Sequence, residues 1–90
     1  MVDIKFASEV ETYLVKLKRK DKKLFSRIDK QLFLFAQNPK HPSLRTHKLS
    51  GRMKNVWSIS VNMSIRMVYL KINKDSYVFV KIGTHEEIYK

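Results

Sequence analysis

Residues 56–83 read VWSISVNMSIRMVYLKINKDSYVFVKIG, and their pattern predicts most of a β-sheet. Apolar and polar residues alternate from Val56 to Met63, which is the pattern of a strand with one buried face. The segment Ile65–Ile72 is more apolar and is predicted to be a central strand, and Tyr77–Ile82 is predicted to be a third. Turn residues separate these strands at Asn62–Ser64 and at Asn73–Asp75. Short connections join neighbouring antiparallel strands, so the stretch predicts a three-stranded meander.

The segment N-terminal to these strands has the residue spacing of helices. A short strand is predicted at Asp3–Phe6, and Ser8 with Glu11 matches the S-x-x-E capping box of a helix start. Asp21 is the predicted N-cap of a second helix, which ends at Asn38-Pro39 because proline disfavours helix in the preceding residue. Helices that meet with almost no linker form an antiparallel hairpin. The segment Pro39–Gly51 is predicted to be loop.

These elements predict an α+β fold in the order β-α-α-β-β-β, as a single domain of residues 1–90. Amphipathic helices bury their apolar stripes, so we expect the helical hairpin to pack on one face of a twisted antiparallel sheet. The first long strand should turn Trp57, Ile59, Val61 and Met63 toward this core. The other face of the sheet is then left partly open and can hold a ligand.

The charge distribution points to a polyanionic partner. The chain has 90 residues and a formal net charge of +11, and not one Asp or Glu lies between Asp29 and Asp75. A cationic surface without interspersed acids is typical of proteins that bind nucleic acid phosphates. Cysteine is absent, which excludes disulfides and thiolate metal sites and fits a cytoplasmic protein. The N-terminus has no long apolar run, so we expect neither a signal peptide nor membrane binding.

Four segments together resemble the RelE/ParE superfamily of toxin–antitoxin toxins. They are His47-Lys48-Leu49-Ser50-Gly51 with Val56-Trp57-Ser58-Ile59-Ser60, then Ser64-Ile65-Arg66-Met67-Val68-Tyr69, and finally Lys81-Ile82-Gly83-Thr84-His85-Glu86-Glu87-Ile88-Tyr89. The ending is most similar to the YafQ and RelE branches. Each motif is weak alone, but their order and spacing span essentially the whole chain.

The resemblance implies a type II toxin that cleaves mRNA in the ribosomal A site without a metal or other cofactor. The ribose 2′-hydroxyl attacks the adjacent phosphate and leaves a cyclic phosphate and a 5′-hydroxyl. The implied partners are a cognate antitoxin, the ribosome and mRNA, with operator DNA contacted only through the antitoxin. Such a reaction requires proton transfers and cations that stabilise the phosphorane.

The resemblance also implies a set of catalytic residues. His85 matches the general acid, and Arg66 matches the arginine that stabilises the phosphorane. Lys81 stands where related toxins have a second arginine, and lysine lacks the bidentate fork. The chain has no counterpart of the family's carboxylate base, so base catalysis is left to His47 or to Tyr89, whose ring matches one that stacks on an mRNA base. The residues predicted to contact RNA phosphates are Arg45, Lys48, Arg52 and Lys54.

Each of these residues also has a purely structural interpretation. Arg66 is a lone charge in an apolar strand, which is costly unless it forms a salt bridge or reaches a wet groove. His85 and His47 fit solvated tail and loop histidines, Lys81 an outward-facing strand residue, and Tyr89 a ring that packs the tail onto the sheet. The nuclease hypothesis therefore requires His85 and Arg66 to face one common positively charged hollow.

Two further functions are compatible with the same fold. One is a ParE-like toxin that inhibits DNA gyrase, although the combination of His85, Arg66 and Tyr89 argues against it. The other is a non-catalytic basic module that binds RNA or the ribosome. A supercoiling assay identifies the first, and the absence of a cyclic-phosphate product identifies the second.

Overall fold

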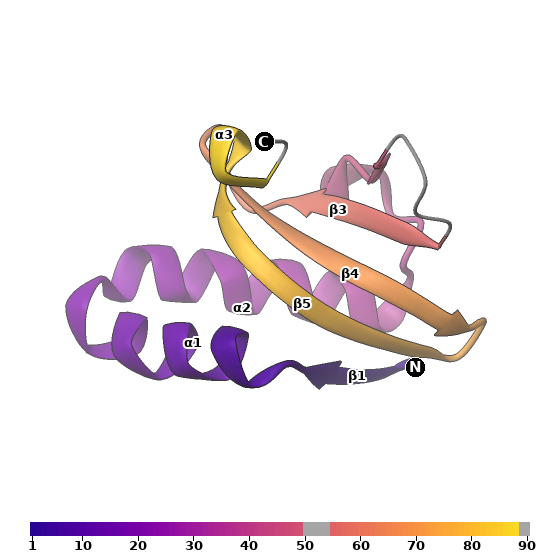
Figure 1. The fold of residues 1–90 in the computed structure, drawn as a ribbon, viewed down its shortest axis with the longest axis horizontal. Coiled ribbons are helices and arrows are strands. Elements are labelled where there is room, and N and C mark those ends of the chain that lie inside the picture. Colours follow the sequence, from indigo (N-terminus) through magenta and orange to yellow (C-terminus); the bar gives the residue numbers. More distant parts are fainter. Residues whose placement is uncertain (50–54, 89–90) are drawn as a thin grey trace.

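The computed structural model describes residues 1–49 and 55–88, and Figure 1 shows their arrangement. Two long helices cover one face of a five-stranded sheet whose order is β1-β5-β4-β3-β2. The elements are β1 (Asp3–Phe6), α1 (Ser8–Lys20), α2 (Lys22–Gln37), the 3-10 helix η1 (Pro42–Leu44), β2 (His47–Lys48), β3 (Val56–Ser60), β4 (Ile65–Asn73), β5 (Ser76–Thr84) and α3 (His85–Ile88). This arrangement confirms the predicted α+β class and the helical hairpin on a sheet.

The helix boundaries are set by a tertiary contact at one end and by local chemistry at the other. Ala7, not Ser8, is the N-cap of α1, and it makes no side-chain capping bond, so the predicted capping box is wrong. The Ala7 N–H donates to the Phe79 carbonyl oxygen at 2.9 Å, which fixes where the chain enters the helix. Asp21 caps α2 as predicted, because its Oδ1 accepts from the Leu24 N–H at 3.1 Å. Helix α2 ends at Gln37, just before Asn38-Pro39.

The sheet differs from the prediction in its edges. Strand β4 is central and β3, β4 and β5 form the predicted antiparallel meander, but β1 pairs in parallel with β5, so the sheet is mixed. This parallel pairing is possible because α1 and α2 lie between β1 and the other strands in the chain. The connection is long enough for β1 to run in either direction relative to β5. The predicted loop from Pro39 contains η1 and the two-residue β2, which adds to the edge of β3.

Strand β3 is shorter than predicted. It ends at Ser60, because the side chain of Asn62 accepts from the N–H groups of Ser64 and Ile65 at 2.8 and 2.7 Å and forms the predicted turn. Met63 lies in this turn and is fully exposed, so its predicted place in the core is wrong. Trp57 and Ile59 do pack with the core.

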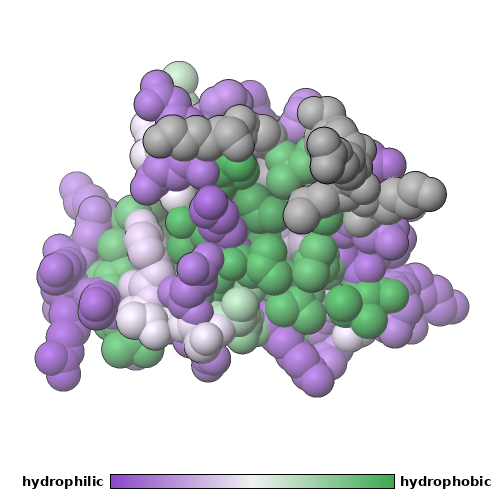
Figure 2. Space-filling model, in the orientation of Figure 1, coloured by the Kyte–Doolittle hydropathy of each residue, from purple (hydrophilic) through white to green (hydrophobic). Residues whose placement is uncertain are grey.

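The core lies between α2 and the sheet. Phe35 of α2 is fully buried, and its ring centroid lies 4.9 to 5.1 Å from those of Tyr69, Tyr77 and Phe79 in edge-on geometry. The opposite face of the sheet is seen in Figure 2 as a central group of hydrophobic side chains with hydrophilic ones around it. Its half-buried members include Leu70, Val78 and Val80.

Candidate active site

Strand register places Arg66 on the sheet face opposite the helices. Residues directly opposed on antiparallel strands project to the same face. Arg66 is opposed to Ser60 on β3 and to Gly83 on β5, and His47 on β2 is opposed to Ser58. Ile59 and Met67 alternate with these positions and are fully buried in the core beneath the helices. The side chains of Arg66 and of the residues opposed to it therefore project from the other face of the sheet.

The guanidinium of Arg66 is held by two neutral acceptors. Its Nε donates to the Ser58 hydroxyl at 3.2 Å, and its Nη2 donates to the Arg45 carbonyl oxygen at 3.1 Å. Within residues 1–49 and 55–88, no carboxylate is bonded to it, so the structural salt bridge is wrong for this part of the chain. Among the described residues, Arg66 therefore has only neutral partners, and these fix its orientation.

A strained loop residue supplies one of these acceptors. Arg45 caps η1 in the left-handed conformation, with φ 48° and ψ 52°, which is costly for a residue with a Cβ. Its N–H donates to the Pro42 carbonyl oxygen at 3.1 Å, and its carbonyl accepts from Arg66. The turn after η1 thus serves to orient the strand arginine.

Helix α3 positions His85 by a capping box that the sequence analysis missed. The Thr84 N–H donates to Glu87 Oε1 at 2.8 Å, and the Glu87 N–H donates to Thr84 Oγ1 at 3.3 Å. Gly83 permits the fold-back, because a Cβ at this position would lie 3.0 Å from Glu87 Oε1. The T-x-x-E spacing of residues 84–87 is the sequence signal that identifies this short helix.

Three of the five predicted catalytic residues line one hollow. This hollow has a volume of about 300 Å³, and its lining residues are Arg45, Thr46, His47, Arg66 and His85. They come from four separate parts of the chain: the η1 turn, β2, β4 and the start of α3. Both histidines are exposed at its rim, and Arg66 is half-buried below them. This is the convergence that the nuclease hypothesis requires.

The other predicted site residues lie elsewhere. Lys81 is exposed on the same sheet face, opposed to Val68, but does not line the hollow. Lys48 points to the opposite face, with its Nζ 5.6 Å from the centroid of the Trp57 ring. Tyr89, Arg52 and Lys54 lie outside the described residues.

Two more hollows extend the site toward α2. The first has a volume of about 390 Å³ and shares Arg45 and Arg66 with the histidine-lined hollow, while Arg27 and Gln31 of α2 form its far side. A third hollow shares Arg27 and adds Lys23, together with the acidic residue Asp21. We call the three together the basic groove; its lining cations other than histidine are Lys23, Arg27, Arg45 and Arg66.

Side chains of α2 tie the helix to the chain at the end of β3. Arg27 Nε donates to the Val61 carbonyl oxygen at 2.9 Å, and Gln31 Nε2 donates to the Ser60 carbonyl oxygen at 2.8 Å. Residues four apart lie on the same helix face, so Gln31 reaches the last residue of β3 while Arg27 reaches the residue after it. Arg27 was not predicted as a site residue, because nothing in the helical pattern indicates which polar face meets the sheet.

Two other kinds of feature are absent from the described residues. They contain no cluster of three His, Cys, Asp or Glu side chains suited to a metal ion. None of their helices is long and apolar enough to cross a membrane.

Comparison with known proteins places this geometry in a recognised fold. No protein-family model and no curated protein sequence matches the chain. Among solved structures, a YoeB/ParE toxin from Agrobacterium tumefaciens superposes with a TM-score of 0.79 at 15% identity, covering 93% of this chain and 99% of that one. The chain has the RelE/YoeB toxin fold.

Two further structures support this assignment of the RelE/YoeB fold. The YoeB–YefM complex from Staphylococcus aureus matches with a TM-score of 0.77 at 17% identity, covering 94% of this chain and 98% of that one. YafQ from E. coli matches with a TM-score of 0.71 at 18% identity, over the full length of both chains. The fold implied by the sequence motifs is thus confirmed. Sequence identities this low do not show which reaction the chain catalyses, so its activity is inferred from the site itself.

Proposed function

We propose that the chain is the toxin of a type II toxin–antitoxin pair and acts as an endoribonuclease on ribosome-bound mRNA. One observation carries the proposal: His47, Arg66 and His85 line a single hollow, and Arg66 carries a charge that no carboxylate of the described residues neutralises. Two histidines and a fixed arginine are the groups that 2′-hydroxyl attack on a phosphodiester requires.

Each residue takes one part of the reaction in this proposal. His47 accepts the proton of the attacking 2′-hydroxyl, and His85 donates a proton to the departing 5′-oxygen. Arg66 stabilises the additional negative charge of the phosphorane with its guanidinium N–H groups. The products are a 2′,3′-cyclic phosphate and a 5′-hydroxyl, so the reaction consumes no water at this step.

The basic groove gives the RNA strand a path through the site. It leads from the histidines past Arg45 and Arg66 to Arg27 and Lys23. Arginines spaced along a groove position a strand by its phosphates without selecting its sequence. We propose that the strand on one side of the cleaved bond follows this groove.

The proposed protein partner is an antitoxin that covers the sheet face opposite the helices, where Arg66 lies. Two of the similar structures are protein complexes, one of YoeB with YefM and one of YafQ with DinJ. In this chain the sheet face opposite the helices combines the half-buried side chains of Leu70 and Val78 with the guanidinium of Arg66. A segment with apolar side chains and acidic flanks matches that surface.

Induced expression in a bacterial host tests the proposal. Wild-type protein is expected to stop translation and to generate new mRNA 5′ ends within the reading frame, mapped by primer extension. His85→Ala and Arg66→Ala should each abolish the new ends while circular dichroism shows an unchanged fold. Full toxicity of both variants would refute the site assignment, and inhibition of gyrase supercoiling without mRNA cleavage would refute the nuclease.

A further inference from the structure

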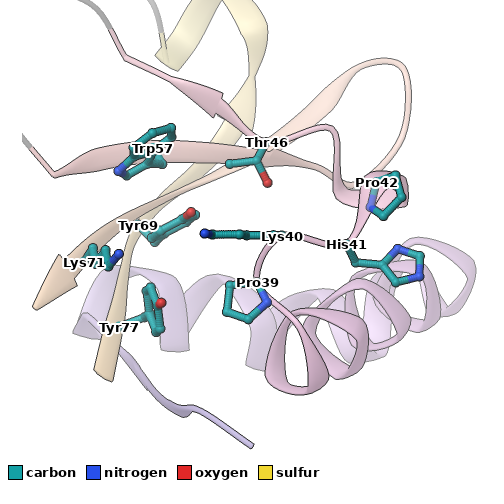
Figure 3. A pocket seen from close by; sticks show the side chains of 9 residues that line it. All are labelled: Pro39, Lys40, His41, Pro42, Thr46, Trp57, Tyr69, Lys71 and Tyr77. Atoms are coloured by element: carbon teal, nitrogen blue, oxygen red, sulfur yellow. The ribbon is translucent and has the colours of Figure 1, made fainter. Parts of the chain in front are cut away.

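A separate hollow lies on the helix-facing side of the sheet, where α2 stops short of the ends of the strands. Helix α2 ends at Gln37, and the chain then turns through Pro39 toward η1. The space left between this turn and β3, β4 and β5 has a volume of about 360 Å³, within the usual range for small-ligand sites, about 300–1,000 Å³. We call it the aromatic hollow (Figure 3); it is lined by Pro39, Lys40, His41, Pro42, Thr46, Trp57, Tyr69, Lys71 and Tyr77.

Aromatic rings form the floor and one wall of this hollow. Tyr69 and Tyr77 are buried, with ring centroids 5.6 Å apart, and the Tyr77 hydroxyl donates to the Lys74 carbonyl oxygen at 3.0 Å. Trp57 is half-buried and stands at the rim, so part of its ring is accessible. Such a surface offers π-stacking to a planar ligand, which an aliphatic lining does not.

Lysines surround the rings, and no acid of residues 1–49 and 55–88 lines the hollow. Lys40 and Lys71 are exposed lining residues, and Figure 3 shows the Lys40 side chain extending across the hollow toward Tyr69. The Nζ of Lys48 lies 5.6 Å from the centroid of the Trp57 ring, in cation–π range. A ligand that fits must therefore combine a planar ring with negative charge.

We propose that the aromatic hollow binds an unpaired nucleotide, with the base against Trp57 and the phosphate between Lys40 and Lys71. A nucleotide satisfies both requirements, because its base stacks on aromatic rings and its phosphate pairs with ammonium groups. An inorganic anion leaves the rings without a partner, and a neutral apolar ligand leaves the lysines without one. This site stands apart from the proposed cleavage site and does not depend on it.

The position of Thr46 connects the two sites. Thr46 lines both the aromatic hollow and the histidine-lined hollow, which lie on opposite sides of the sheet edge formed by β2. A strand that passes over this edge reaches both. The nucleotide in the aromatic hollow thus has two possible sources, a free mononucleotide or one residue of an RNA strand.

Intrinsic fluorescence tests the proposal directly, because Trp57 is the one tryptophan of the chain. The full-length protein is titrated with adenosine 5′-monophosphate, and saturable quenching is expected. Ribose 5-phosphate should produce no quenching, since it lacks the base. Lys40→Gln combined with Lys71→Gln should weaken the apparent affinity about tenfold, as expected when two solvent-screened charge contacts are lost.

The matched control is Lys5→Gln combined with Lys30→Gln, which removes two exposed lysines that do not line the hollow. This variant should retain at least half of the wild-type affinity. A short single-stranded oligoadenylate that quenches at a much lower concentration than the mononucleotide would identify an RNA strand as the source of the nucleotide. Equal affinities for the two would identify a free nucleotide. The proposal is overturned by a lack of saturable quenching, by equal quenching with ribose 5-phosphate, or by unchanged affinity in the Lys40/Lys71 variant. His85→Ala should keep the quenching, so failure of the proposed nuclease is a separate result.

Discussion

At the scale of single residues, the central feature is that Arg66 is oriented before any substrate binds. Its two partners are Ser58, which is fully buried, and the backbone carbonyl of Arg45. Pre-oriented donors stabilise a developing charge without the cost of reorganisation. The lone charge in an apolar strand was the sequence signal for this residue. Its partners were not predictable, because they depend on strand register and on the turn at Arg45.

Arg66→Lys keeps the charge but removes the planar fork, so it tests this orientation. We expect the cleavage rate on ribosome-bound mRNA to fall about 100-fold, the usual cost of losing a transition-state donor. Ser58→Ala should lower the rate less, about tenfold, because it loosens the arginine without removing it. Both rates are measured in single-turnover reactions. A fully active Arg66→Lys enzyme would contradict the proposed role.

Tyr69 gives a prediction for alkaline stability. Burial, with a smaller contribution from Tyr77, raises the pKa of Tyr69 from 10.0 to about 12. The folded state therefore favours the neutral phenol. The resulting contribution to the free energy of unfolding is fully present below pH 10 and is lost as pH rises from about 10 to 12, because the unfolded chain ionises first. The loss should be on the order of 2 kcal/mol in the free energy of unfolding. Urea titrations at pH 9 and pH 11.5 measure it, and Tyr69→Phe should show a clearly smaller fall.

At the scale of elements, α3 illustrates how one sequence pattern succeeds at one place and fails at another. Both Ser8-x-x-Glu11 and Thr84-x-x-Glu87 match a capping box, yet only the second forms one. The entry to α1 is fixed instead by the backbone bond from Ala7 to Phe79, a tertiary contact that local sequence does not report. The capping box at Thr84 is local, and its spacing could have been read from the sequence.

Removing this cap should release His85 without unfolding the protein. Glu87→Ala eliminates the acceptor for the Thr84 N–H, and we expect a stability loss of at most about 1 kcal/mol but a cleavage rate at least about tenfold lower. Glu87→Gln keeps an acceptor and should restore most of the rate. Amide hydrogen exchange at Thr84 should accelerate in Glu87→Ala. The exposed neighbour variant Glu86→Ala is the control, and an equal loss of rate there would contradict this role of the cap.

The strands show the same division between local and tertiary information. The meander was predictable, because long strands carry a clear alternation from Val56 onward. Strand β2 was not, since two residues carry no periodicity, and the parallel pairing of β1 with β5 is an edge choice made in three dimensions. These two unpredicted pairings matter for the site, because β2 delivers His47 to the hollow.

At the scale of the whole molecule, the net charge of +11 is partly concentrated in the basic groove. The absence of acids between Asp29 and Asp75 predicted a phosphate-binding surface. It did not predict the contributions of Lys23 and Arg27, which precede that stretch and join the groove only because α2 packs against β3. The convergence of His47, Arg66 and His85 likewise came from the resemblance to known toxins rather than from local pattern.

Arg27 offers a test of the groove as an RNA path. Arg27→Gln should weaken the binding of a single-stranded oligoribonucleotide and lower the slope of log affinity against log salt by about 0.7, the value for one phosphate contact on a single strand. Fluorescence anisotropy at several salt concentrations measures both quantities. Lys30→Gln removes a charge from the same helix outside the groove and should leave the slope unchanged. An unchanged slope in Arg27→Gln would exclude Arg27 from the path.

The most direct test of the whole account is the end chemistry of mRNA incubated with purified ribosomes and this protein. Wild-type protein should cut the mRNA in the A site and leave a 2′,3′-cyclic phosphate and a 5′-hydroxyl, whereas His85→Ala should cut at least about 100-fold more slowly. Intact mRNA with the wild-type protein, or equal cleavage by wild type and His85→Ala, would contradict the proposal that His47, Arg66 and His85 form a ribonuclease site.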